Sequence, residues 1–199
     1  MFRYIAEDIA FLLIKNKIVD IEKRDECVYG AEVLLLNLSN VLTALIISIL
    51  TKTMLHFAAF ALIFVPLRIF IGGFHTKTSE SCYLISSTIY ALTVLCFKLM
   101  PELYTNIPAI ITLVVLIVSI VLFAPVEHKN NLLSEYERKR NRLISIVLTV
   151  IDSLIFIALY YLSVSTATSV MIFMTVNSVL MLIGLLINRT EKKIGGVNL

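Results

Sequence analysis

Apolar stretches long enough to cross a membrane are the feature that most constrains how this chain can fold. A transmembrane helix needs about 20 predominantly apolar residues, and six stretches of the sequence qualify. They cover approximately residues 33–51, 54–71, 82–100, 107–126, 143–162 and 167–188. The composition agrees, because 59% of the residues are hydrophobic, 16% are charged and the mean hydropathy is +0.93. We therefore predict an all-α polytopic membrane protein, with residues 1–199 forming a single membrane domain.

The distribution of Lys and Arg predicts how the chain is oriented. Six spans place both termini on the same side of the membrane, and 15 of the 17 basic residues fall in segments on that side. Because cytoplasmic segments carry the excess of basic residues, we expect a multi-pass cell-membrane protein whose termini and loop 68–82 face the cytoplasm. The basic segment 127–142 would face the same way, in contact with lipid or with the acidic tail of a peptide.

The first 30 residues differ from the spans, because charged residues interrupt their apolar ones. The apolar positions recur at helical spacing: Phe2, Ile5, Ile9, Leu12 and Leu13. This pattern predicts an amphipathic helix that lies in the membrane interface. It serves either as an anchor at the membrane surface or as a helix that helps to dock a peptide at the cytoplasmic face.

One polar interruption, RIFIGGFHTKTSESC at residues 68–82, separates the second and third spans. It brings His75 and Cys82 onto one loop. Only a thiolate is a good nucleophile, and a nearby imidazole is the usual base that generates it. On one continuous helix the two residues would stand about 10.5 Å apart along the axis, whereas proton transfer needs about 3 Å. If the pair acts together, the segment has to fold back between them.

Other residues of this loop permit such a turn. Gly72 and Gly73 supply backbone freedom where the second span ends, and Thr78 or Ser79 is a natural N-cap for the third span. With Ser79 as the cap, Cys82 is the third helical residue, where the helix dipole favours a thiolate and free amide groups could receive an oxyanion. The alternative is that this histidine and cysteine are purely structural.

Charged residues around the loop have less defined roles. Glu80 is the acid nearest in sequence, which makes it an orienting or peptide-binding candidate. Arg68 could pair with Glu127, at the end of the fourth span, or with a substrate carboxylate. Asp152 lies about ten residues into the fifth span, where an acid is costly, and we expect it to pair with Asn177.

We expect no metal site and no cofactor. His75, Cys82 and His128 are conceivable ligands, but the sequence has no close-spaced pair such as CxxC or HExxH. The three cysteines, the other two being Cys27 and Cys96, are an odd number on scattered segments. This argues against a disulfide framework.

The loop RIFIGGFHTKTSESC resembles the signature of the accessory gene regulator protein B (AgrB) family: an arginine, a Gly-Gly or close variant, a histidine, and a cysteine seven positions after it. The segment APVEH after the fourth span is also similar. A length near 200 residues, an amphipathic N-terminus, about six spans and a basic loop extend the resemblance over essentially the whole chain. One departure is visible, because this chain has KNNLL where family members often carry a Lys-Pro pair.

The resemblance implies a membrane-embedded cysteine endopeptidase, a thiol protease of quorum sensing in Gram-positive bacteria, that processes an AgrD-like autoinducer propeptide. It implies Cys82 as the nucleophile and His75 as its base, with Arg68, Gly72 and Gly73 as supporting residues. Cleavage near the C-terminal end of the propeptide would leave an acyl-enzyme thioester. A thiol or hydroxyl of the bound peptide would then close a thiolactone or lactone ring.

Two other functions stay open on the residues alone. A small peptide transporter or export component without protease activity would need polar residues along its spans, and few are present besides Asp152, Asn37, Asn40 and Asn177. A non-enzymatic scaffold would leave Cys82 no more reactive than the other cysteines. As partners we expect the propeptide and membrane lipid, together with a homodimer, and no nucleic acid.

Overall fold

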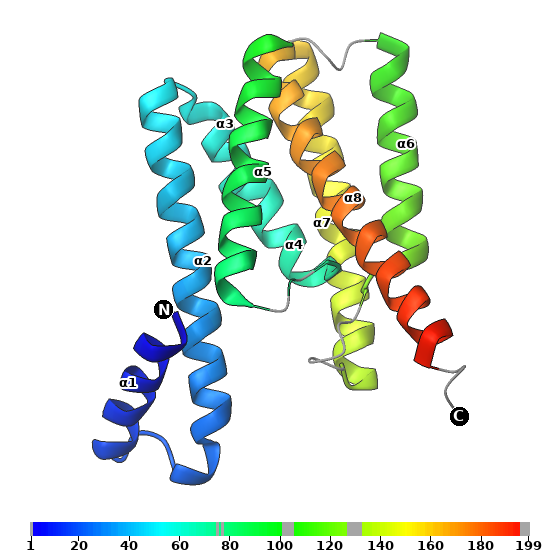
Figure 1. Ribbon diagram of the computed structural model, residues 1–199. Coiled ribbons are helices and arrows are strands. Elements are labelled where there is room, and N and C mark those ends of the chain that lie inside the picture. Colours follow the sequence, from blue (N-terminus) through cyan, green and yellow to red (C-terminus); the bar gives the residue numbers. More distant parts are fainter. Residues whose placement is uncertain (1, 75, 77, 101–105, 127–132, 196–199) are drawn as a thin grey trace. The chain divides into compact units, whose positions relative to one another are not determined.

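The computed structural model describes residues 2–74, 76, 78–100, 106–126 and 133–195 (Figure 1). Within these ranges the regular structure is helical. The β-type pairing found there is one isolated bridge between Gly72 and Val126. The α-helices are α1 (Phe2–Lys15), α2 (Arg24–Thr51), α3 (Met54–Ala59), α4 (Val65–Ile71), α5 (Ser79–Leu99), α6 (Asn106–Phe123), α7 (Glu135–Leu162) and α8 (Val164–Gly195). A 3-10 turn at Ile21–Lys23 precedes α2, and a π-helix at Phe60–Phe64 joins α3 to α4.

Helical segments long and apolar enough to cross a membrane number five within the described residues. They are Ile21–Thr51, Met54–Ile71, Ser79–Leu99, Glu135–Leu162 and Val164–Thr190. This confirms the predicted all-α polytopic membrane fold. The remaining predicted span, at 107–126, forms α6, whose apolar part Ala109–Phe123 is shorter than the other segments.

Contacts between residues divide the chain into two compact units. The first unit comprises Met1–Lys52 and Thr76–Leu92, and the second comprises Thr53–His75 and Thr93–Leu199. Helix α5 therefore begins in the first unit and ends in the second. The single domain that we expected over residues 1–199 remains a prediction.

In the first unit, α1 packs on α2 through small side chains. Ala6 and Ala10 are 0% exposed and form a cluster with Val28 of α2. The larger apolar residues Ile5 and Leu12 are exposed. The face of α1 that packs is therefore centred on alanines, which allow the two helices to approach closely, and only part of the predicted apolar stripe takes part.

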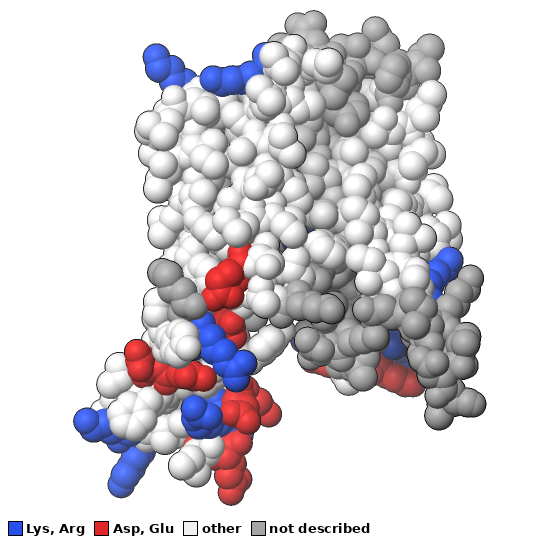
Figure 2. All heavy atoms as spheres, in the orientation of Figure 1, with Lys and Arg blue, Asp and Glu red and all other residues white. Residues whose placement is uncertain are grey.

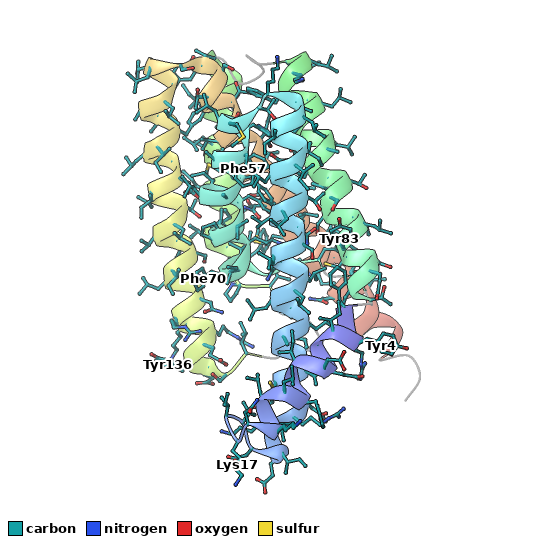
Figure 3. The ribbon with its side chains drawn as sticks, turned by 90° about the vertical axis from the view of Figure 1, so that its left-hand side faces the viewer. Tyr4, Lys17, Phe57, Phe70, Tyr83 and Tyr136 are labelled. Atoms are coloured by element: carbon teal, nitrogen blue, oxygen red, sulfur yellow. The ribbon has the colours of Figure 1, made fainter. Side chains whose placement is uncertain are left out.

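Charged side chains of the first unit gather on α1, on the turn after it and on the beginning of α2 (Figure 2). Lys17 lies in that turn with a left-handed φ of 55° (Figure 3). Helix α2 starts at Arg24, whereas the first span was predicted from about residue 33. The helix continues through charged residues because they can stay in water, while residues 33–51 contain no charged side chain.

Helix α5 contacts α2 through paired hydroxyl groups. Thr43 and Tyr83 share a hydrogen bond of 2.8 Å, and Ser48 and Tyr90 share one of 2.5 Å. Phe2 of α1 packs against the ring of Tyr83 with centroids 5.8 Å apart. Between helices surrounded by lipid, apolar contact has little driving force, so polar pairs of this kind help to hold the helices together.

In the second unit, α7 begins with a complete capping box. The Ser134 hydroxyl accepts from the Glu137 amide at 3.3 Å, and the Glu137 carboxylate accepts from the Ser134 amide at 2.9 Å. Helix α7 therefore begins at Glu135, eight residues before the predicted start of the fifth span at 143. Basic residues that we placed in a loop lie on its first turns: Arg138, Lys139, Arg140 and Arg142.

The second predicted span is interrupted by the π-helix Phe60–Phe64. Asn177 of α8 donates from Nδ2 to the carbonyl of Phe64 at 3.2 Å, which satisfies a backbone group at the end of the irregular turn. We expected Asn177 to pair with Asp152, and the structure gives it this other partner. The Asp152 side chain is 3% exposed, and its Oδ2 has no hydrogen-bond partner within the described part of the chain.

The apolar core of the second unit gathers where α4, α6 and α8 meet. Leu67 and Ile71 of α4, Ile120 of α6 and Met181 of α8 are each 0% exposed and form one cluster. Val126, just after α6, belongs to the same cluster. Because the core includes the last residue of α4, it fixes the point at which the following loop begins.

Candidate functional site

The segment Gly72–Phe74 follows α4 and leads directly to His75 in the sequence. Helix α4 ends at Ile71. Gly72 has a φ of 67° and Gly73 a φ of 115°, conformations that side chains with a Cβ rarely adopt. The two glycines therefore turn the chain out of the helix.

A parallel backbone bridge ties this segment to the end of α6. The Gly73 amide donates to the carbonyl of Val126 at 3.1 Å, and the Val126 amide donates to the carbonyl of Ile71 at 2.9 Å. The Val126 carbonyl also lies so close to Gly72 that a Cβ there would overlap it. Gly72 is required by this close approach as well as by its φ.

Arg68 holds the same segment from within α4. Its Nη1 donates to the carbonyl of Gly72 at 2.5 Å, and its Nη2 donates to the carbonyl of Phe74. A planar guanidinium can bridge two acceptors in this way, which a single ammonium cannot do with the same geometry. We expected Arg68 to pair with Glu127 or with a substrate. Glu127 lies outside the described residues. The two hydrogen bonds of Arg68 hold the backbone of Gly72–Phe74, so we call Arg68 the clamp residue.

Helix α8 supplies a further contact to this segment. The Phe74 amide donates to the carbonyl of Leu180 at 3.0 Å. One turn along α8, a Cβ built on Gly184 would stand 2.5 Å from both the Gly73 carbonyl carbon and the Phe74 nitrogen. The loop backbone therefore crosses α8 in direct contact with it, and only glycine at position 184 leaves the room.

Sequence reasoning missed Val126, Leu180 and Gly184. The carbonyl of Leu180 and the backbone of Val126 can be provided by any residue, so their identities do not reveal these contacts, although Val126 lies within the segment APVEH. Gly184 does carry one, because it is the single glycine in the apolar run 167–188. A glycine inside a helix costs about 1 kcal/mol relative to alanine unless a close approach requires it.

Cys82 lies in the first turns of α5. This helix is capped by Thr78, whose hydroxyl accepts from the Ser81 amide at 3.3 Å, and not by Ser79, which is already helical. The Cys82 amide donates to the carbonyl of Thr78 at 3.0 Å. Cys82 is thus the fourth helical residue and its own amide is used within the helix, so an oxyanion would have to be bound by other donors. Its thiol is free and partly buried.

An acid from another helix contacts the start of α5. The Ser79 hydroxyl donates to the carboxylate of Glu32, which lies on α2. Sequence reasoning did not consider Glu32, although its place immediately before the uncharged stretch 33–51 was a usable signal. Glu80, which we considered instead, has an exposed side chain in the same turn of α5.

His75 lies outside the described residues. Thr76 and Thr78 are described and are not helical, and α5 starts at Ser79. A continuous helix from position 75 to position 82, which would have excluded a dyad, is therefore not formed. That His75 folds back on Cys82 remains a prediction.

His56, the histidine within the second predicted span, has a structural role. His56 is 0% exposed; its Nδ1 shares a hydrogen bond with Ser169 and its Nε2 with Thr93, each at 3.1 Å. The rings of Phe97 and Phe173 lie 4.9 and 4.6 Å from its centroid. Both ring nitrogens of His56 thus make hydrogen bonds between helices, and its ring packs between two aromatic rings. Within the ranges that the structure describes, no group of three His, Cys, Asp or Glu side chains could hold a metal ion.

Comparison with known protein families agrees with the resemblance seen in the loop. The sequence model for accessory gene regulator B matches residues 6–185. The chain belongs to this family. Searches of curated proteins and of solved structures found no match.

Membership of the accessory gene regulator B family implies a part in the processing of a quorum-sensing peptide. Members are generally membrane proteases that act on a propeptide, so an AgrD-like propeptide is the implied partner. The apolar helices fit a membrane protein. The matched range extends over the clamp residue Arg68, over Cys82 and as far as Gly184.

Proposed function

We propose that this member of the accessory gene regulator B family is a cysteine endopeptidase, with Cys82 as nucleophile and His75 as base. The observation that carries the proposal is how firmly the chain is held next to both positions. Gly72–Phe74, directly before His75, is bound by Arg68 and by groups from the end of α6 and from α8. Cys82 lies in the first turns of α5. Each set of contacts fixes the chain within its own unit, and an ordered backbone next to each residue suits a reaction in which a misplacement of about 1 Å can cost about 100-fold in rate.

The proposed reaction follows from thiol chemistry. His75 takes the Sγ proton, and the Cys82 thiolate attacks the carbonyl carbon of a peptide bond near the C-terminal end of the propeptide. Collapse of the tetrahedral intermediate breaks that bond, and the departing amine takes a proton from the imidazolium. The remaining peptide is held as a thioester on Cys82. Attack by a thiol or hydroxyl of the bound peptide then releases Cys82 and closes a thiolactone or lactone ring.

The surrounding residues take supporting roles in this proposal. Arg68, Gly72 and Gly73 are positioning residues, because they fix the backbone that leads to His75. Ser79 starts the helix that carries Cys82. Glu80 is a candidate for binding the peptide, since its exposed carboxylate can accept hydrogen bonds from backbone amides. A role for Glu127 stays a prediction.

A cleavage assay tests the proposal. Purified protein in lipid vesicles is incubated with a synthetic AgrD-like propeptide, and mass spectrometry detects the released C-terminal fragment and the peptide bound to Cys82 as a hydroxylamine-sensitive adduct. Cys82→Ser and His75→Ala should release no fragment, whereas Cys27→Ser and Cys96→Ser should release it at the parent rate. Full release by Cys82→Ser would refute the proposal.

A peptide transporter without protease activity is the alternative, and Asp152 is the observation in its favour. Its side chain is 3% exposed within an apolar helix, which is costly unless the acid has a function. The nearby hydroxyls of α7 do not extend it into a pathway, because Ser145, Thr149 and Ser153 each donate to a carbonyl of their own helix. Accumulation of intact propeptide inside vesicles, with no cleavage, would favour the alternative.

The predicted homodimer, the contacts with lipid and the cytoplasmic orientation in a Gram-positive cell membrane also belong to this proposal. Crosslinking in vesicles tests the dimer. Labelling of Cys82 from either side of a sealed membrane tests the orientation.

A further inference from the structure

The start of α5 is tied to α2 by a carboxylate. Ser79, the first residue of α5, donates a hydrogen bond from its hydroxyl to Glu32. Cys82 follows three residues later. Residues three apart are neighbours on a helix surface, so the contact with Glu32 and the thiol of Cys82 lie on adjacent parts of the same side of α5.

Glu32 is itself held in place by the packing of α2. Its neighbours Ala31 and Leu35 pack against the cluster that α1 and α2 form through Ala6 and Ala10. Glu32 is half-buried and directly precedes the uncharged stretch 33–51. The carboxylate thus projects from a well-packed part of α2, at the level where its charged residues end.

The bond to Ser79 differs from the other polar contacts between α2 and α5. Thr43 with Tyr83, and Ser48 with Tyr90, are neutral hydroxyl pairs. A hydrogen bond to a carboxylate is about twice as strong as a neutral one. It also acts at the N-terminal end of α5, where a helix frays most easily. Of these three contacts, the bond between Glu32 and Ser79 is the one made at the first residue of α5, three residues before Cys82.

We propose that Glu32 is a positioning residue for Cys82, which it serves by holding Ser79 and with it the first turn of α5. This inference rests on the proposed function and adds to it a residue of α2 that does not touch the reacting atoms. Glutamine keeps an acceptor oxygen at the same reach and loses only the added strength of the charged bond, so it should retain most of the positioning.

Five variants test this role in the full-length protein in vesicles: Glu32→Ala, Glu32→Gln, Ser79→Ala, Glu32→Ala with Ser79→Ala, and Ser48→Ala. Propeptide cleavage gives kcat and KM, and a maleimide probe gives the labelling rate of Cys82 relative to Cys27. Ser48→Ala is the matched control, because it removes a hydrogen bond between the same two helices farther along α5.

Glu32→Ala and Ser79→Ala should each lower kcat by about 10- to 100-fold with KM little changed, since the thiol is misdirected while the peptide still binds. Both should also slow the labelling of Cys82. The double variant should be no worse than either single variant, because both remove the same bond. Glu32→Gln should stay within about threefold of the parent, and Ser48→Ala should cleave at the parent rate.

Three results would overturn the inference. Parent activity in Glu32→Ala would show that the bond is not needed. A loss in Glu32→Gln as large as in Glu32→Ala would show that the charge acts, on the substrate or on the base. An equal loss in Ser48→Ala would show that general docking of α5 matters instead. If Glu32→Ala does not fold, Ser79→Ala and Glu32→Gln decide. Failure of the proposed function is seen separately, as cleavage by Cys82→Ser.

Discussion

Replacement of Gly184 by alanine is the sharpest test of how the loop before His75 is held. The added Cβ would stand 2.5 Å from the Gly73 carbonyl carbon and from the Phe74 nitrogen, whereas ordinary contact begins at 3.4 Å. The loop must therefore move by 0.9 Å, the difference between these distances, or lose its hydrogen bond to Leu180. Because a shift of about 1 Å can cost about 100-fold in rate, propeptide cleavage should fall by about 100-fold.

The folded state should suffer much less than the activity. Overpacking costs about 1–3 kcal/mol, and the higher helix propensity of alanine returns about 1 kcal/mol of this. Gly30→Ala is the matched control, because a Cβ on Gly30 of α2 meets no atom within 4 Å. It should gain the same helix propensity and keep full activity. Parent-level cleavage by Gly184→Ala, measured by mass spectrometry of the released fragment, would refute the reasoning.

Further substitutions test other contacts. Arg68→Lys should lower cleavage by about tenfold or more, because one ammonium cannot reach both loop carbonyls; parent activity would show that one hydrogen bond is enough. Ser134→Ala should lower the stability of α7 by about 1 kcal/mol through loss of the capping box, seen as a lower unfolding midpoint in detergent with cleavage unchanged. Ala10→Leu should cost about 1–3 kcal/mol by forcing α1 away from α2, and faster proteolysis of α1 would report it; unchanged proteolysis would contradict the packing described.

The all-α polytopic fold and the start of α5 were predictable because their signals are local. Runs of apolar residues identify membrane helices by length alone. The hydroxyl residues before Cys82 predict an N-cap, and Thr78 is that cap. Helix α7 starts eight residues before the predicted span at 143, because apolar length does not detect helical residues that lie in water. Ser134 and Glu137 form a capping box, and their S-x-x-E spacing is a sequence signal for that start.

The contacts that hold the candidate site were less accessible to sequence reasoning, because some join positions far apart in the chain and others are made to backbone groups. Arg68 was recognised as part of a motif, yet its partners are carbonyls six or fewer residues away, which a search for opposite charges does not find. Leu180 acts through its backbone and leaves no trace in its identity. Glu32 meets Ser79 only because α2 and α5 pack together.

The contact between the segment Gly72–Phe74 and α8 has a consequence for the biogenesis of the protein. Phe74 is synthesised 106 residues before Leu180, the residue that accepts its amide hydrogen bond. At roughly 5–20 residues per second, the loop leaves the ribosome about 5–20 s before α8 exists to receive it. Nascent chains that have not yet inserted α8 therefore lack this hydrogen bond to Gly72–Phe74, and the proposed cleavage should begin only after α8 has entered the bilayer.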